Sequence, residues 1–225
     1  MRMDHTMENN SSSGNNSKGL QEVADDIKAA IATGELKPGQ RLVESQLCEL
    51  FGLKRNRIRE ALRKLEHEGF VKITPNVGAV VAEFSQRDIE HIYDLLSVLD
   101  GLSVRLATPF ITGDQFKHLE TLVKRMEATD KLSLFSGYND DLHSLFCTYS
   151  ENSRLINFAE NLRLSIKAFG YRSFYVPGQI ATSNTEHRKI LQAIKTNKPL
   201  LAERIMRDHV IDAKNRLIKW MYRSL

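Results

Sequence analysis

Two short helical patterns separated by one glycine constrain the fold of this chain more than any other feature. The first pattern ends at about Phe51, with Leu47, Leu50 and Phe51 at helical spacing. Gly52 follows, and glycine is the residue best suited to the left-handed position that ends a helix. The second pattern starts near Lys54 and has a single apolar stripe, formed by Ile58, Ala61, Leu62 and Leu65. Two short helices joined by a glycine turn are typical of a helix-turn-helix, whose second helix enters the major groove of DNA.

The polar side of the second helix is strongly basic. Arginine forks fit guanine O6 and N7, and an asparagine amide fits adenine N6 and N7. Taken alone, a solvated cationic helix surface is the more common explanation of such a pattern, but the turn before it and the hairpin after it favour DNA binding. The predicted DNA-binding residues of this helix are Lys54, Arg55, Asn56, Arg57, Arg59 and Arg63.

A predicted β-hairpin follows directly. Residues 70–74 and 79–83 are β-rich runs, and residues 75–78 between them carry a turn signal. A two-stranded ribbon after a recognition helix is a wing, whose tip, with Gly78, could lie along or in the minor groove. The alternative is a hairpin that only covers the core of the small domain.

The segment from Leu20 to Glu83 resembles the winged helix-turn-helix of GntR-type bacterial regulators. The matching pieces are residues 36–42, 44–45, 59–65, 68–69 and 75–81, and their ordered set is specific. The resemblance implies that Arg55, Arg59 and Gly78 approach DNA. The sequence departs from the family pattern where Lys54 replaces a serine, Asn56-Arg57 replaces a threonine-proline pair and Val77 replaces an arginine, which bears on the operator sequence.

Composition and length place few further limits on function. The 225 residues allow one or two domains, and the net charge of +4 is compatible with nucleic acid without requiring it. Cys48 and Cys147 form no metal or redox pattern, so a reduced cytoplasm is expected. No apolar run approaches the roughly 18 residues of a membrane span, and the N-terminus lacks a signal-peptide pattern.

The rest of the chain predicts a mainly α fold. Residues 1–17 are polar and expected to be disordered, and residues 18–84 form the winged helix-turn-helix domain. Residues 85–225 carry six helical patterns, which predict an antiparallel six-helix bundle that binds a ligand and dimerises. The expected helices span 86–108, 112–129, 132–150, 154–173, 178–196 and 199–223. The first of them is apolar over a wide arc, which favours a homodimer.

Three histidines lie on the apolar stripes of three different bundle helices: His143, His187 and His209. A single such residue is more often a hydrogen-bonded core histidine. Three together indicate a metal site built from facing helices, and imidazole suits zinc or nickel. Asn139, Asp140 and Cys147 lie one turn from His143 and are candidates for a fourth donor.

Residues 88–220 resemble the FCD effector domain of the FadR branch of the GntR family. The matching pieces are residues 99–102, 105–107, His143 with Ser150 and Asn152, residues 186–191, 193–194 and 206–209. The resemblance implies a divalent metal held by one aspartate and three histidines beside a small carboxylate ligand. It carries the histidines over to His143, His187 and His209, and places Asn139 at the aspartate position. Leu96 stands where an arginine is frequent, which leaves Arg105 and Arg163 as candidate effector anchors.

These observations favour a dimeric, non-enzymatic transcription regulator that binds an operator in double-stranded DNA and responds to a small-molecule effector. The alternative is a metal-dependent hydrolytic enzyme that uses the three-histidine site, with Glu186 as the candidate base. A third possibility is a purely structural bundle whose histidines are core residues.

Overall fold

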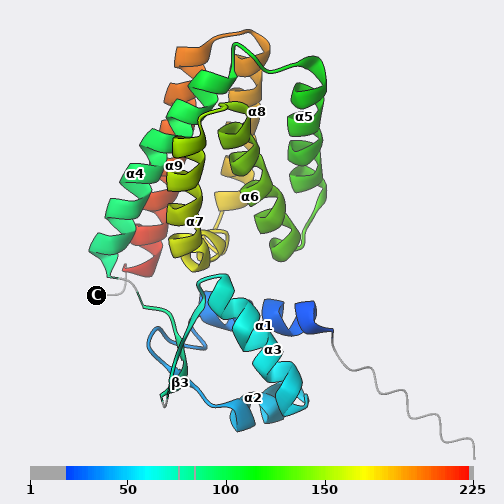
Figure 1. Cartoon of the computed structure of the whole chain (residues 1–225), viewed down its shortest axis with the longest axis vertical. Coiled ribbons are helices and arrows are strands. Elements are labelled where there is room, and N and C mark those ends of the chain that lie inside the picture. Colours follow the sequence, from blue (N-terminus) through cyan, green and yellow to red (C-terminus); the bar gives the residue numbers. More distant parts are fainter. Residues whose placement is uncertain (1–18, 76, 84, 223–225) are drawn as a thin grey trace, which may run out of the picture.

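The computed structural model describes residues 19–75, 77–83 and 85–222, without the side chains of 165, 166 and 168–170. The predicted mainly α architecture is confirmed: a small winged head lies below a helical bundle (Figure 1). The predicted disordered tail, residues 1–17, lies outside the described residues, as does the end of the last helix at Arg223. The division of the chain between residues 84 and 85 remains a prediction. None of the described helices combines the length and apolar content that a bilayer span requires.

The head is built on three helices: α1 (Leu20–Thr33), α2 (Glu44–Phe51) and α3 (Arg55–His67). Gly52 ends α2 at φ 65°, and its N–H donates to the carbonyl of Cys48. This left-handed turn lets α3 start three residues later and direct its apolar stripe inward. Ile58 and Leu65 are fully buried, so the predicted helix-turn-helix is confirmed.

The wing contains β2 (Val71–Thr74) and β3 (Gly78–Val81), which pair antiparallel with Thr74 opposite Gly78. The structure adds a third strand, β1 (Arg41–Leu42), on the other edge of β3. Only two strands were predicted, because a strand of two residues is too short to show the alternating pattern. The sheet order β1-β3-β2 ties the wing back to the segment that leads into α2.

The six predicted bundle helices are all present, with ends within one or two residues of the expected positions where the structure describes them. Ser85 caps α4 by accepting the N–H of Asp88, and Pro199 occupies the first turn of α9. The helices are α4 (Gln86–Ala107), α5 (Gly113–Ala128), α6 (Leu132–Tyr149), α7 (Ser153–Ser173), α8 (Gln179–Lys195) and α9 (Pro199–Met221).

Two helix pairs set the frame of the bundle. The longest helices, α4 and α9, lie side by side along one edge (Figure 1), and Gly101 lets them approach closely. A Cβ at Gly101 would lie 3.2 Å from the carbonyl oxygen of Glu203. Helix α8 also packs on α9, and α6 and α7 pack on α4. These contacts bring α4, α6, α8 and α9 around one buried centre.

The head rests on α7 through α1 and the start of the wing. The ring of Phe70 meets that of Tyr171 edge-on, with centroids 5.8 Å apart, and both side chains are buried. At Gly69 the two backbones nearly touch, because a Cβ there would lie 2.8 Å from the carbonyl oxygen of Leu164. The head and the bundle of one chain therefore share a packed contact.

Candidate metal centre and DNA-binding face

The three predicted metal-ligating histidines come together inside the bundle. His143 comes from α6, His187 from α8 and His209 from α9, and all three are buried. One ring nitrogen of each lies within 4.8 Å of the others. Helices far apart in sequence thus deliver three imidazoles to one point, which is the arrangement that a shared metal ion requires.

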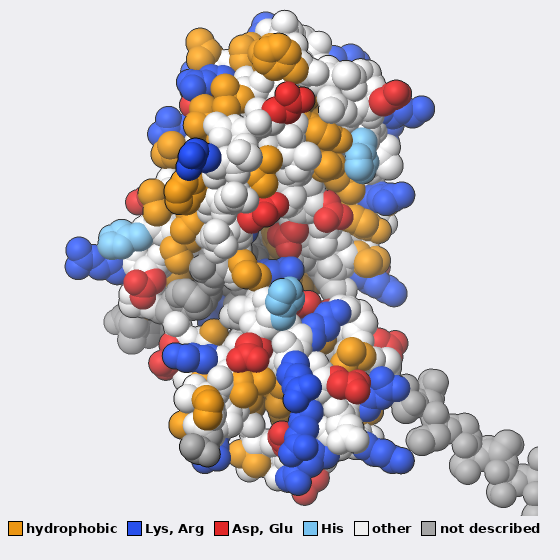
Figure 2. Space-filling model, in the orientation of Figure 1, with side chains coloured by type: hydrophobic (Ala, Val, Ile, Leu, Met, Phe, Trp, Pro, Cys, Tyr) orange, Lys and Arg blue, Asp and Glu red, His pale blue; other side chains and the backbone are white. Residues whose placement is uncertain are grey.

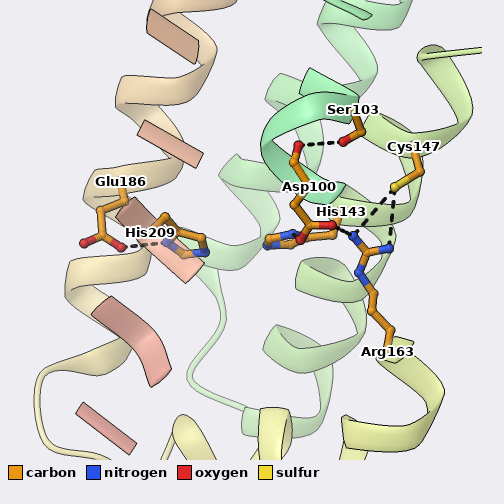
Figure 3. Close-up of polar contacts among 7 residues, drawn as sticks. All are labelled: Asp100, Ser103, His143, Cys147, Arg163, Glu186 and His209. Carbon is orange, nitrogen blue, oxygen red and sulfur yellow. Dashed lines mark hydrogen bonds and ion pairs between the residues drawn. The ribbon is translucent and has the colours of Figure 1, made fainter. Parts of the chain in front are cut away.

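Asp100 of α4 orients the first of these histidines. Its Oδ2 lies 2.8 Å from Nδ1 of His143 (Figure 3). Burial would raise the pKa of Asp100, but the Arg163 guanidinium and the bond to His143 outweigh burial and hold the pKa below its ordinary value. The carboxylate is therefore ionised and can only accept, so Nδ1 of His143 must carry the proton. Nε2 is then left with a free lone pair for a metal.

Glu186 of α8 orients the ring of His209. Its Oε2 lies 2.6 Å from Nδ1 of His209 (Figure 3). Glu186 was the candidate base of a hydrolytic site, but this bond makes it an orienting group for the imidazole. Carboxylate–histidine pairs of this kind commonly support metal-ligating histidines. Asp100 was not predicted as a partner of His143, because the two are 43 residues apart.

His187 differs from both. It is completely buried, and neither of its ring nitrogens has a hydrogen-bond partner among the described residues. Burial, together with the nearby His209 and His143, lowers the pKa of His187 well below its ordinary value, so the ring is neutral. A buried polar group without a partner costs about 1–3 kcal/mol. A metal ion at the centre would satisfy one of these nitrogens, so the residues present fit such an ion.

A pocket of about 100 Å³ opens beside the histidines. Its lining includes Asn139, the predicted fourth donor, and its neighbour Asp140. Burial raises the pKa of Asp140 to about 6. The third candidate, Cys147, is buried and lies 3.6 Å from Nη1 of Arg163. Of the three candidate donors, Asn139 and Asp140 therefore face the pocket beside the histidines, whereas Cys147 is not among its lining residues.

The structure separates the two predicted effector anchors. Arg163 of α7 lines the pocket, and its guanidinium binds Oδ1 of Asp100. Arg105 is not among the lining residues, and its Nη1 instead donates to Glu203 of α9 at 3.0 Å. Lys167, which the sequence analysis did not single out, lines the same pocket one helical turn after Arg163.

Lys and Arg side chains gather on the surface of the head (Figure 2), and the predicted DNA-binding residues are all exposed. Exposed are Lys54, Arg55, Asn56, Arg57, Arg59, Arg63 and, at the wing, Gly78. Arg55, Arg59, Arg63 and Gly78 line one groove of about 360 Å³ between α3 and the wing. Arg41 of β1 lines the same groove and was missed, because the short strand that places it there was not predicted.

The acid Glu44 lines this groove with the arginines. Glu44, the first residue of α2, accepts Nε of Arg59 at 2.8 Å with one carboxylate oxygen and pairs with Nε of Arg55 at 3.0 Å with the other. Both arginines use Nε for this contact. Glu44 therefore links the two arginines through a single carboxylate.

A second cavity, of about 180 Å³, lies where the head meets the bundle. Lys28, Glu68 and Phe70 of the head and Tyr171 of α7 contribute to its wall. Asp140 and Lys167 line this cavity and also the pocket beside the histidines. Their side chains lie 3.9 Å apart. The two cavities therefore share one ion pair.

Comparison with known proteins agrees with this architecture. Residues 91–212 match the FCD domain, and residues 20–81 match the bacterial regulatory proteins of the gntR family. The HTH-type transcriptional regulator YdhC of Bacillus subtilis is 30% identical over 177 residues, which are 75% of this chain and 77% of that protein. The Glc operon transcriptional activator of Escherichia coli K12 is 27% identical over 221 residues, 87% of each chain.

A further relative, the probable D-xylose utilization operon transcriptional repressor of Paenarthrobacter nicotinovorans, is 26% identical over 196 residues, 84% of each chain. Solved structures share the fold. E. coli McbR/YncC superposes with a TM-score of 0.61 at 20% identity, covering 91% of this chain and 97% of that one. The chain therefore belongs to the GntR family of bacterial transcription regulators and carries an FCD effector-binding domain.

Proposed function

We propose that this regulator uses a divalent ion, zinc or nickel, at the three-histidine centre to bind its effector. The observation that carries this proposal is His187, whose two buried ring nitrogens have no partner among the described residues and lie beside two carboxylate-oriented histidines. His143, His187, His209 and Asn139 would hold the ion. Imidazole nitrogens suit both metals, and a centre with four donors leaves positions for water or effector if the ion accepts five or six.

The effector is proposed to be a small metabolite in the pocket beside the centre. Arg163 and Lys167 supply cations to this pocket, and Asn139 supplies an amide. Arg163 is already bonded to Asp100, whereas Lys167 and Asp140 are 3.9 Å apart, a looser pair. An anionic effector would therefore pair with Lys167 more readily than with Arg163, because breaking the looser ion pair requires less free energy. The relative named for D-xylose utilization is in keeping with a small carbon compound as effector.

The DNA-binding face is proposed to read a near-palindromic operator in the cytoplasm, where the DNA lies. Arg55, Asn56 and Arg59 lie off the buried stripe of α3 near its first turns, where recognition helices contact base edges. Arg57 and Arg63 lie beside them and would contact phosphates. Gly78, at φ 93° and exposed, would let the wing approach the backbone closely.

A homodimer is proposed because α4 presents apolar side chains that the fold leaves uncovered. Leu95 is 55% exposed and Val98 46% exposed, although both stand in the apolar arc that the sequence shows. Leu200 of α9, at 71%, lies on the groove beside α4. Pairing of two such faces would bury these residues and hold the heads at half-site spacing, about one helical turn of DNA apart.

Effector control requires a physical link between pocket and head, and α7 is proposed to be that link. Arg163 of α7 binds Asp100 at the centre, Lys167 lines both cavities and Tyr171 packs on Phe70 of the head. An effector that draws Lys167 away from Asp140 would bind one arrangement of this junction better than another. Only such a difference in effector affinity between two arrangements can change the position of the heads and hence DNA binding.

The test of the metal proposal is zinc content and thermal stability after dialysis against zinc. Wild type is expected to retain about one zinc per chain and to melt at a higher temperature than the zinc-free protein, because an ion that binds only the folded state stabilises it. His143→Ala and His187→Ala should retain none. If all three proteins carry the same trace of zinc and zinc shifts none of their melting curves, the centre is not a metal site.

A further inference from the structure

Two of the three histidines each have a carboxylate as partner, and an arginine lies next to each carboxylate. His143 is bonded to Asp100, which is bound by Arg163 of α7. His209 is bonded to Glu186, and the guanidinium of Arg216 of α9 lies near that carboxylate. Each imidazole is thus followed by a carboxylate and then by an arginine. The two sets differ in how closely the arginine engages, because Arg163 is in direct contact with Asp100 while Arg216 is not in hydrogen-bonding contact with Glu186.

The guanidinium of Arg216 is hydrogen-bonded through Nε and faces Glu186 with Nη2. Its Nε donates to Oε1 of Gln179 at 2.6 Å. Its Nη2 lies 3.7 Å from Oε2 of Glu186, and this buried nitrogen has no hydrogen-bond partner in the described part of the chain. That Oε2 is the same atom that receives Nδ1 of His209. The cation therefore faces the oxygen on which the orientation of His209 depends.

We propose that Arg216 is a positioning residue for the metal centre, acting through Glu186 on His209. This inference rests on the proposed metal site. A glutamate has three side-chain torsions, and a positive charge 3.7 Å from its half-buried carboxylate favours the torsions that keep the two groups close. A fixed carboxylate holds the ring of His209 and its tautomer, so Nε2 points where a metal can use it.

The same arginine also touches the wall of the effector pocket. Gln179, which accepts from Arg216, donates its Nε2 to Oγ of Ser183 at 3.0 Å. Gln179 and Ser183 both line the pocket and are each 1% exposed. A chain of contacts therefore runs from the pocket wall through Arg216 and Glu186 to His209. An effector that bonds to Gln179 or Ser183 is then expected to change zinc affinity, and zinc to change effector affinity by the same factor.

The experiment measures zinc affinity by chelator competition and the visible absorption of bound Co²⁺, whose bands report ligand geometry. Arg216→Met removes the charge and keeps the length. Arg216→Lys restores charge without the planar fork. Lys214→Met is the matched control, because Lys214 is also on α9 and pairs at 2.6 Å with Asp94, outside the site.

We expect Arg216→Met to bind zinc about 10-fold more weakly than wild type, the lower end of the effect of removing a direct partner of a metal ligand, because Arg216 acts through Glu186. Its Co²⁺ bands should shift, Arg216→Lys should recover part of the affinity, and Lys214→Met should match wild type. If wild type binds zinc and Arg216→Met binds it equally with the same Co²⁺ spectrum, the role of Arg216 is refuted while the metal site stands. If wild type binds neither ion, both are refuted. Should Arg216→Met fail to fold without metal, Arg216→Gln provides the same comparison.

Discussion

The ring of Phe70, at the start of the wing strand, meets the ring of Tyr171 in the bundle at a centroid distance of 5.8 Å and an angle of 76°. Phe70 is 1% exposed and Tyr171 6% exposed, so this edge-to-face pair is a buried joint between the head and the bundle. Aromatic pairs of this geometry contribute about 0.5–1.5 kcal/mol beyond the area that they bury. The pair acts together with the contacts of α1 on α7, which also hold the head against the bundle.

Truncating this joint should loosen the head without affecting the metal centre. Tyr171→Ala removes a buried aromatic ring, a change that typically costs about 3–5 kcal/mol. We expect faster amide hydrogen exchange in α1 and unchanged zinc affinity. Tyr171→Phe keeps the ring and serves as the control. Unchanged exchange in α1 of Tyr171→Ala would show that the joint does not hold the head.

Removing the base-reading arginines should weaken operator binding. Arg55→Ala or Arg59→Ala is expected to cost about 1–3 kcal/mol on the selected operator and to relax base preference, because each fork reads a base edge. Arg63→Ala should weaken all DNA sequences similarly and reduce the salt dependence. Binding titrations on selected and scrambled duplexes at several salt concentrations check this. Equal operator affinity of wild type and the Arg55→Ala, Arg59→Ala double variant would contradict the assignment.

Glu44→Gln should raise the affinity for random DNA and lower the preference for the operator. The change removes the one acid that pairs with both Arg55 and Arg59. We expect tighter binding to random DNA at low salt, because a negative charge leaves the DNA-binding face, and a smaller ratio of operator to random affinity, because the forks lose their anchor. Glu49→Gln is the control, since this exposed residue of α2 makes the same change in charge. A ratio that falls equally in both variants would argue against a positioning role of Glu44.

Acid should destabilise the zinc-free protein through its histidines. The pKa values of His187 and His143 are lowered in the folded state, so both bind protons more readily when unfolded. Their titration therefore leaves the free energy of unfolding unchanged above about pH 6.5, the unfolded value, and lowers it as the pH falls below that value. His187→Leu is expected to raise the zinc-free stability above pH 6.5, because it removes two unpartnered buried nitrogens, and to flatten this pH dependence. Urea unfolding from pH 5 to 8 measures both effects, and a profile for His187→Leu parallel to that of wild type would contradict them.

Asn139→Asp should tighten metal binding. Asn139 lines the pocket beside the histidines, and a carboxylate is a stronger donor to a divalent ion than a neutral amide oxygen. Zinc competition against a chelator is expected to show higher affinity for Asn139→Asp and lower affinity for Asn139→Ala. Identical affinities of wild type and both variants would exclude residue 139 from the ligand set.

Much of the fold follows from local pattern. Gly52 between two apolar stripes sets the helix-turn-helix, and helical periodicity with breaks such as Pro199 sets the six bundle helices. These signals are local, because a left-handed turn and an amphipathic stripe each depend on a few neighbouring residues. The same periodicity placed His143, His187 and His209 on inward faces. It follows that their meeting at one point required only that the helices form a single core.

Only the tertiary structure decided which residues far apart in the sequence contact one another. Asp100 lies beside His143 and Arg105 lies away from the pocket, although both are on α4, because the rotation of α4 against its neighbours decides which side chains point inward. Strand β1 exists only because β3 is there to pair with it. The joint of Phe70 with Tyr171 depends on how the head docks on α7. Such contacts join residues tens to a hundred positions apart, and their energy comes from close packing and charge pairing that no local sequence pattern records.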